Sequence, residues 1–219
     1  MINRVIRHLL YCDFVLNFSI GLLSPIFAVF VLKQINGSTL EVIGIATVCY
    51  WIARVTTTVP LSRFMDRTDG ERDEFYFLLF GTMIVATIPL LYIFARLPWH
   101  IYVIQFIYGL ANSMAVPGWR ILFTDHIDEG KTGYEWSLQD VEGGIAVGVS
   151  AYLGAVLAQR YGFPTVLTIV SILGYTAAFL LLFIYKDAKT LKQIKAEHEL
   201  KDLRSRRRGM LAVGTHHVK

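Results

Sequence analysis

Six long apolar stretches dominate this chain and limit what it can fold into. Each exceeds the ~20 residues that a helix needs to cross a bilayer core roughly 30 Å thick. Because no water reaches the backbone at that depth, each stretch is predicted to be a helix that satisfies its own hydrogen bonds. We therefore expect an all-α, polytopic membrane protein whose six transmembrane helices span residues 9–32, 40–61, 75–95, 101–123, 137–158 and 165–185.

The charges of the loops predict how these helices cross the membrane. Lysine and arginine gather on one side: before the first stretch, between the second and third, between the fourth and fifth, and after residue 185. The opposite loops carry only Lys33, Arg96 and Arg160. Since cytoplasmic loops are enriched in lysine and arginine, both termini are predicted to be cytoplasmic, in a plasma (inner) membrane.

Composition leaves little room for a soluble domain. Of the 219 residues, 54% are hydrophobic, and residues 9–185 form the predicted transmembrane domain. Residues 1–8 are predicted to be a short cytoplasmic N-terminus, and residues 186–219 a basic, partly helical cytoplasmic tail. Such a tail suits anionic lipid headgroups, so the net charge of +4 does not indicate a nucleic-acid partner. Cys12 and Cys49 fall within predicted helices and indicate packing, with neither a disulfide nor a metal framework.

The six helices divide into two sets of three that cross in opposite senses. Pro25 and Pro117 are each the seventeenth residue in the first helix of their set, which is a point of similarity between the two sets. Inverted repeats of this kind recur in secondary transporters. A 3+3 inverted repeat is therefore predicted.

Polar side chains within the predicted helices are confined to four of them. They are costly in a bilayer, so they usually face a cavity or another helix. Helices 75–95 and 165–185 hold no charged or amide side chain between their ends, and are predicted to face lipid while the other four surround a wet cavity. The predicted cavity residues are Asn17, Arg54, Gln105, Tyr108 and Asn112.

Asp13 and Arg54 are charges at similar depth on neighbouring helices. Asp13 lies four residues and Arg54 seven residues from the predicted cytoplasmic helix ends, or ~6 Å and ~10 Å. An ion pair between them would offset the cost of both charges. Alternatively, each extends alone to the cytoplasmic headgroups, which is our interpretation of Glu142.

Helix 137–158 carries small residues on one face, among them Gly144 and Gly148. Small residues at this spacing let helix backbones approach closely in a membrane, so both glycines are predicted to pack against a neighbouring helix. A hinge in a moving helix is the alternative.

The loop between the second and third helices resembles a known signature. It reads Pro60-Leu61-Ser62-Arg63-Phe64-Met65-Asp66-Arg67-Thr68-Asp69-Gly70-Glu71-Arg72, similar to the G-x-x-x-D-R-x-G-R-R loop of the major facilitator superfamily. Asp66, Arg67, Gly70 and Arg72 match in kind, whereas Ser62 replaces the first glycine and one extra residue precedes Gly70. In that family the aspartate and arginines form a network that holds one access state closed, which implies a cytoplasmic gate here. An ordinary positive-inside loop with balancing acids is the alternative.

The helices around this loop extend the resemblance over residues 9–185. The segments similar to the N-terminal six-helix half of such transporters are Ser24-Pro25-Ile26-Phe27, Tyr108-Gly109-Leu110, Pro117-Gly118-Trp119 and Arg160-Tyr161-Gly162-Phe163. Two positions differ: Gln105 replaces an arginine that many proton-coupled members carry, and Gly148-Val149 replaces the glycine-proline pair of antiporters. These differences argue against proton-driven drug antiport and leave Asp13 as the candidate for proton coupling.

Length is the largest difference from that family, whose members have twelve helices in two six-helix halves. Because six is an even number, two copies of this chain insert in the same orientation, and a two-fold homodimer would rebuild a complete cavity. The resemblance therefore implies a half-size, homodimeric carrier that moves a small-molecule substrate across the lipid bilayer by alternating access.

Two other functions stay open. The chain could be a non-transporting six-helix subunit that partners a separate half. An intramembrane enzyme is disfavoured, because no histidine lies deep in a predicted helix and neither His-Glu-x-x-His nor Gly-x-Ser-x-Gly occurs. We expect no catalytic residue, metal site or cofactor.

Overall fold

The computed structural model describes residues 2–67 and 71–185, which are almost entirely helical. The elements are α1 (Arg4–Leu23), a 3-10 turn η1 (Ser24–Ile26), α2 (Phe27–Gln34), α3 (Leu40–Met65), α4 (Arg72–Phe94), α5 (Pro98–Asp125), α6 (Thr132–Tyr161), α7 (Phe163–Leu181) and η2 (Leu182–Ile184). These two ranges contain no strand, which confirms the all-α class. The predicted tail helix and Gly70 lie outside the described residues.

Five described segments are long and apolar enough to cross a membrane: Arg4–Gln34, Leu40–Met65, Arg72–Phe94, Thr132–Tyr161 and Phe163–Ile184. The sequence predicts a sixth crossing at α5, which is 28 residues long. Its apolar run is interrupted by Gln105 and Asn112, so its composition does not identify it as a membrane span as it does for the other five segments.

The helices extend beyond the apolar stretches that predict them. α1 begins at Arg4, where the Asn3 side chain caps it by accepting a hydrogen bond from the Val5 backbone N–H at 3.0 Å. α6 begins at Thr132, several residues before its apolar stretch. Hydropathy locates the bilayer core, whereas capping groups determine where a helix ends, so the two boundaries differ.

One proline and one glycine divide the helices. Pro25 lies in η1, between α1 and α2, where the missing N–H and the bulky ring interrupt helical hydrogen bonding. Gly162 joins α6 to α7 with a φ of 81°, a backbone conformation in which a side chain would be strained. Pro60, Pro89 and Pro117 lie inside α3, α4 and α5 without ending them.

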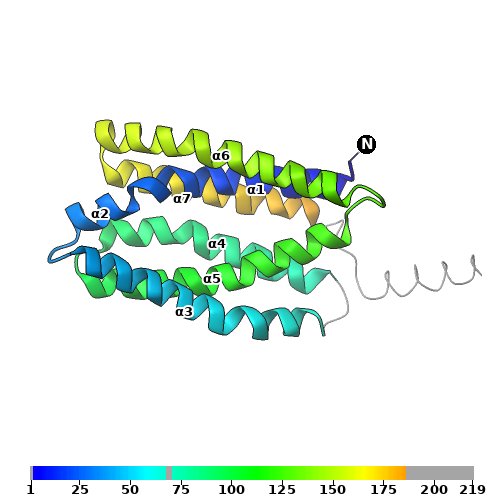
Figure 1. Ribbon diagram of the computed structural model, residues 1–219, viewed down its shortest axis with the longest axis horizontal. Helices are drawn as coiled ribbons and strands as arrows, with labels where there is room; N and C mark the ends of the chain where they lie inside the picture. The colour runs from blue at the N-terminus through cyan, green and yellow to red at the C-terminus, as the bar shows by residue number, and fades with distance from the viewer. Residues whose placement is uncertain (1, 68–70, 186–219) are drawn as a thin grey trace, which may run out of the picture.

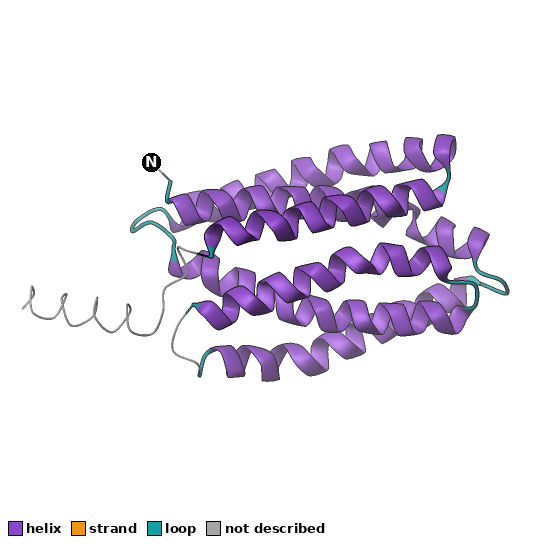
Figure 2. Cartoon of the chain, turned by 180° about the vertical axis from the view of Figure 1, so that it is seen from behind, coloured by secondary structure: helices purple, strands orange, loops and turns teal. Residues whose placement is uncertain are grey.

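Figure 1 shows two groups of helices, α1, α6 and α7 in one and α3, α4 and α5 in the other. α1 packs against both α6 and α7, and α5 packs against both α3 and α4. α4 and α7 contact each other and so join the two groups, an arrangement that Figure 2 shows from behind.

The exposure of α4 and α7 differs from the sequence prediction that they face lipid. They bury the largest share of their apolar segments, while α3 and α6 bury the smallest. α4, for example, exposes Phe80 and Met83 but buries Leu78 and Val85. Because α4 and α7 join the two groups of helices, each of them leaves only one face exposed.

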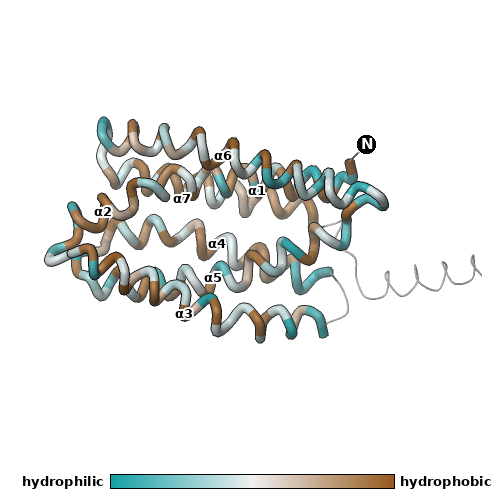
Figure 3. Tube along the Cα trace, in the orientation of Figure 1, coloured by the Kyte–Doolittle hydropathy of each residue, from teal (hydrophilic) through white to brown (hydrophobic). Residues whose placement is uncertain are grey.

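Consecutive long helices run in alternating directions between the two ends of the bundle (Figure 1). The start of α1, the end of α3, the start of α4, the α5–α6 connection and the end of α7 lie together at what we call the amino-terminal end (Figure 1). There the Asn3 side-chain amide donates a hydrogen bond to the His126 carbonyl at 3.1 Å. At the opposite end the Asn36 backbone N–H donates to the Arg96 carbonyl at 3.0 Å. Figure 3 shows hydrophilic residues gathered towards these ends, with apolar residues along the helices between them.

Candidate functional site

Two adjoining cavities of about 240 and 200 Å³ form a groove that we call the charged groove. They share Asn112, Val116 and Arg120 of α5. Its charged lining residues are Asp13, Arg54, Asp66 and Arg120. They come from α1, α3 and α5, and α6 adds Trp136 and Gln139. The groove lies in the half of the bundle nearer the amino-terminal end.

Arg54 is held on the α3 side of the charged groove by aromatic side chains. Its Nη1 donates a hydrogen bond of 2.6 Å to the Tyr50 hydroxyl, one turn earlier. Its guanidinium carbon lies 5.8 Å from the centre of the Tyr50 ring and 5.3 Å from that of Trp51. Aromatic faces attract a guanidinium, so these contacts hold the Arg54 side chain at the groove without supplying a counter-charge.

Asp13 has a different set of partners from the one that the sequence predicts. Gln139 of α6 donates a hydrogen bond of 3.1 Å from Nε2 to Asp13 Oδ2. The Glu142 carboxyl group, one turn further along α6, also interacts with Asp13. Among the described residues, neither Asp13 nor Arg54 has an ion pair, so the expected Asp13–Arg54 pair does not form. The physical reason is that α1 packs on α6 and α7, whereas α3 packs on α5.

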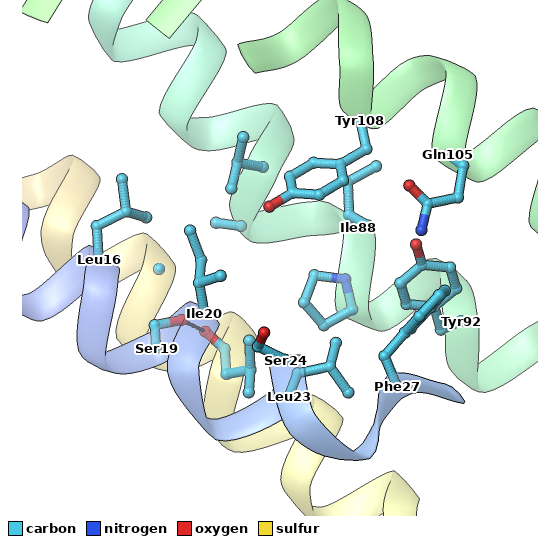
Figure 4. A pocket seen from close by; sticks show the side chains of 15 residues that line it. Leu16, Ser19, Ile20, Leu23, Ser24, Phe27, Ile88, Tyr92, Gln105 and Tyr108 are labelled. Carbon is cyan, nitrogen blue, oxygen red and sulfur yellow. Dashed lines mark hydrogen bonds between the residues drawn. The ribbon is translucent and has the colours of Figure 1, made fainter. Parts of the chain in front are cut away.

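The other predicted cavity residues separate into two places. Asn17 lines the charged groove with Asn112, whose side chain donates to the Tyr108 carbonyl at 3.0 Å. Gln105 and Tyr108 line a third cavity of about 210 Å³, which we call the apolar pocket. It lies between α1, α4, α5 and α7, and Figure 4 shows the side chains that line it.

The residues of the signature loop are dispersed. Asp66 lines the charged groove, and Arg67 is exposed. The Arg72 guanidinium lies 5.5 Å from the centre of the Tyr185 ring. No hydrogen bond or ion pair joins these three side chains to one another within the described residues, and Gly70 lies outside that range.

A second set of polar contacts ties the helices together at the amino-terminal end. His126 Nε2 lies 3.6 Å from Glu71 Oε2, and both side chains are largely buried. Lys131 Nζ donates a hydrogen bond of 2.8 Å to Asp128 Oδ2. That bond lowers the pKa of the Asp128 carboxyl and raises the pKa of Lys131, because it stabilises the charged form of each.

Glycine packing occurs elsewhere than the sequence predicts. A side chain added at Gly144 or Gly148 of α6 would meet open space. The close approaches are instead at Gly154 of α6, against the Leu22 backbone, and at Gly109 of α5, against the Tyr50 backbone. The first two glycines face away from every helix described here, so within this chain they do not mediate packing.

Sequence reasoning missed two groove residues that regular spacing could have found. Arg120 lies within the predicted stretch 101–123 and follows Asn112 by eight residues, close to two helical turns. Gln139 lies three residues before Glu142, on the same side of α6. Both lie inside predicted stretches, near their cytoplasmic ends, so a polar stripe followed to the end of its stretch would have included them.

Within the described residues, no group of three or more histidine, cysteine, aspartate or glutamate side chains could hold a metal ion. Cys12 and Cys49 are both free thiols.

Comparisons with known proteins agree with the arrangement of the helices. A family model described as Major Facilitator Superfamily matches residues 9–215. Among solved structures, one titled "In meso crystal structure of the POT family transporter PepTSo" is similar, with a TM-score of 0.66 and 15% identity. That likeness shows a shared fold; it covers 85% of this chain, which spans only 38% of that one. A comparison with curated proteins finds no match. Since the family match includes nearly the whole chain, this multi-pass membrane protein belongs to the major facilitator superfamily.

Proposed function

We propose that this chain is one six-helix half of a secondary transporter that moves a small solute by alternating access. The observation that carries the proposal is the charged groove, where Asp13, Arg54 and Arg120 open into a shared cavity inside a bundle of membrane-spanning helices. Charges at such depth are costly and mark substrate or ion pathways by default. The family match and the shared fold support the same function.

Six crossings with both termini in the cytoplasm form part of the proposal. α5 packs along α3 and α4, so it crosses with them despite its polar residues. Arg4, Arg63 and Lys131 lie near the amino-terminal end, whereas the opposite connections hold only Lys33, Arg96 and Arg160. That bias supports a cytoplasmic amino-terminal end in an inner membrane.

The pattern of helix contacts supports an inverted repeat of α1, α3 and α4 with α5, α6 and α7. Exchanging the two sets converts the contact of α3 with α5 into that of α6 with α1, and the contact of α4 with α5 into that of α7 with α1. The contact of α4 with α7 converts into itself. Every major contact thus has a counterpart, as expected for a repeat related by a two-fold axis in the membrane plane.

A second half would close the charged groove, and we propose a second copy of this chain. α3 and α6 stand at the two edges of the bundle, and each exposes a glycine with nothing around it, Gly44 and Gly148. A two-fold rotation about the membrane normal brings α3 of one copy to α6 of the other. Small residues allow such helices to pack closely. The alternative is a different six-helix half, with this chain acting as a non-transporting partner.

Within the groove, Arg54, Asn17 and Asn112 are the proposed substrate contacts, with Tyr108 and Gln105 reached through the adjoining apolar pocket. Asp66, Arg67, Gly70 and Arg72 are proposed to bias the access equilibrium rather than touch substrate.

Asp13 is the proposed proton-coupling residue, and its surroundings suggest how. Both carboxylate oxygens of Glu142 are buried and accept no hydrogen bond from a donor in the described chain. Its neighbour is another carboxyl group, which is likewise only an acceptor when ionised. One proton shared between Asp13 and Glu142 would give each group a partner and remove one of two adjacent negative charges.

Transport by purified protein in proteoliposomes tests the function. Libraries of labelled sugars, amino acids, organic anions and organic cations would first identify a substrate, with and without a proton gradient. Arg54→Ala is then expected to abolish its flux while membrane insertion survives. Arg160→Ala is the matched control, since Arg160 is exposed at the opposite end and outside the groove. Normal flux through Arg54→Ala would remove Arg54 from the mechanism.

Disulfide crosslinking in membranes tests the second copy. Val48 of α3 and Tyr152 of α6 are exposed, and each lies one turn from its open glycine. In a Cys49→Ser background, mixed Val48→Cys and Tyr152→Cys subunits should form a disulfide dimer. Phe80→Cys with Ile172→Cys, on the outer faces of α4 and α7, should not. Transport without any crosslinked or associated second copy would contradict the homodimer.

A further inference from the structure

We propose that the apolar pocket binds an uncharged small molecule, with a compact ring-containing body and one hydrogen-bonding group that meets Gln105 and Tyr92. This inference deepens the proposed transport function by naming a substrate class. It rests on that function for the claim that the bound molecule is cargo, whereas the binding site itself stands on the contacts below.

Two buried polar side chains of the pocket lack partners. The Gln105 residue is 8% exposed and Tyr92 is 2% exposed. Neither side chain donates or accepts a hydrogen bond within the part of the chain that the structure describes. Figure 4 shows them at the same end of the pocket, beside Phe27. Buried polar groups are nearly always hydrogen-bonded, so this pair is poised for a group that enters the pocket.

Ser19 in the same pocket provides an internal contrast. It is 2% exposed, and its hydroxyl donates a hydrogen bond of 2.7 Å to the Val170 carbonyl. The fold therefore satisfies a buried hydroxyl on the α1–α7 side of the pocket. The two buried groups without a partner, Gln105 and Tyr92, are on the α4–α5 side, which gives the site a polar end and an apolar body.

The walls and the volume define the rest of the ligand. Leu16, Ile20, Leu23 and Ile88 line the pocket with aliphatic side chains, and Phe27 adds an aromatic face. The volume is about 210 Å³. An apolar cavity of about 150 Å³ accommodates benzene, so this pocket suits a bicyclic ring of roughly nine or ten non-hydrogen atoms.

Charge separates this site from its neighbour. None of the described residues that line the apolar pocket is charged, whereas Asp13, Arg54 and Arg120 line the adjoining charged groove. An ion transferred into such surroundings loses its hydration without gaining a counter-charge. The two cavities share Leu16, Ile20 and Val85, so a molecule could still reach the pocket from the groove.

Equilibrium binding of labelled indole to the protein in nanodiscs tests the site. Indole has a bicyclic body and one N–H donor; indole-3-carboxylate and tryptamine are its anionic and cationic counterparts. We expect saturable binding of indole above that of protein-free nanodiscs, and at least tenfold weaker binding of both charged compounds. Gln105→Leu and Tyr92→Phe should each weaken indole binding roughly fivefold.

Control variants make the result specific. Thr58→Val changes a polar side chain that lines the charged groove and not the apolar pocket, and it should leave indole binding within twofold. Ser24→Phe adds volume at an exposed residue of the pocket wall and should block binding. Melting curves of each purified variant confirm folding, so a misfolded variant is replaced by Gln105→Met or Ser24→Leu.

Several outcomes would overturn the inference. Binding no greater than to protein-free nanodiscs is one, and equal binding of the charged compounds is another. Binding of 1-decanol as tight as that of indole, and unchanged in Gln105→Leu, would indicate a site for lipid chains instead. Asp13→Asn separates the two proposals, since it should remove the pH dependence of transport yet leave indole binding intact. Loss of one result without the other identifies which proposal fails.

Discussion

The charged groove and the apolar pocket are built from the same helices but differ in chemistry. α1 and α5 line both, and three residues, Leu16, Ile20 and Val85, belong to both. Towards the amino-terminal end these helices present Asp13 and Arg120; a few turns away they present Leu23 and Gln105 instead. The difference shows that one pair of helices can hold ionised groups at one depth and an uncharged compartment at another.

The largest expected effect comes from placing a charge in the wrong compartment. Gln105→Glu introduces a carboxylate among uncharged walls and should destabilise the protein by about 3 kcal/mol, seen as a lower melting temperature. The loss should be larger at pH 8 than at pH 5, because protonation at low pH removes the charge. Asn112→Asp, two turns away beside Arg120, is the matched change and should cost less than about 1 kcal/mol. Equal losses of stability in Gln105→Glu and Asn112→Asp would contradict the proposed difference between the apolar pocket and the charged groove.

Removing a charge from the groove is expected to act on transport rather than stability. Arg120→Ala should lower the rate of substrate flux at least tenfold, because Arg120 lines both cavities of the groove. Arg63→Ala removes an exposed arginine near the same end and should change flux less than twofold. If both variants lose flux equally, the effect reflects loop charge and the groove has no special role.

The shared proton predicts an altered pH dependence. Asp13→Asn should abolish the variation of flux between pH 5 and 8, and Glu142→Gln should shift it, because each variant leaves one carboxyl group in place of two. The other titratable or charged groups around Asp13 are Cys12 on α1 and Arg120 on α5. His126→Asn is the control, because His126 pairs with Glu71 outside the charged groove, and it should preserve the pH profile. An unchanged profile in Asp13→Asn would assign coupling elsewhere.

The smallest expected effect is on the position of Arg54. Tyr50→Phe removes the hydroxyl that accepts the 2.6 Å hydrogen bond from Arg54 while keeping the aromatic ring. The loss of one such bond is worth about 1 kcal/mol, so the Michaelis constant for substrate should rise roughly fivefold. Tyr11→Phe, at an exposed tyrosine on α1, should change nothing. An unaltered Michaelis constant in Tyr50→Phe would leave the cation–π contacts as the sole support of Arg54.

Much of the candidate site could be read from local pattern. Arg54, Asn17 and Asn112 are polar residues inside apolar stretches, and all three line the charged groove. Their cost in a bilayer is a property of each residue and its depth, so it can be recognised without knowing the neighbours. The partners of these residues could not be predicted in the same way. Asp13 and Arg54 lie at similar depths in the membrane, but depth does not indicate which helices contact each other.

The sequence by itself determined the helical class, the approximate spans and the family, because apolar length and the signature loop are local features. Only the tertiary structure decided that Asp13 meets Gln139, that Gly148 faces open space while Gly154 packs on Leu22, and that Gln105 opens into an uncharged pocket. The physical reason is that helix periodicity assigns a residue to a face of its own helix, whereas the packing of α1 on α6 and α3 on α5 decides what lies opposite that face.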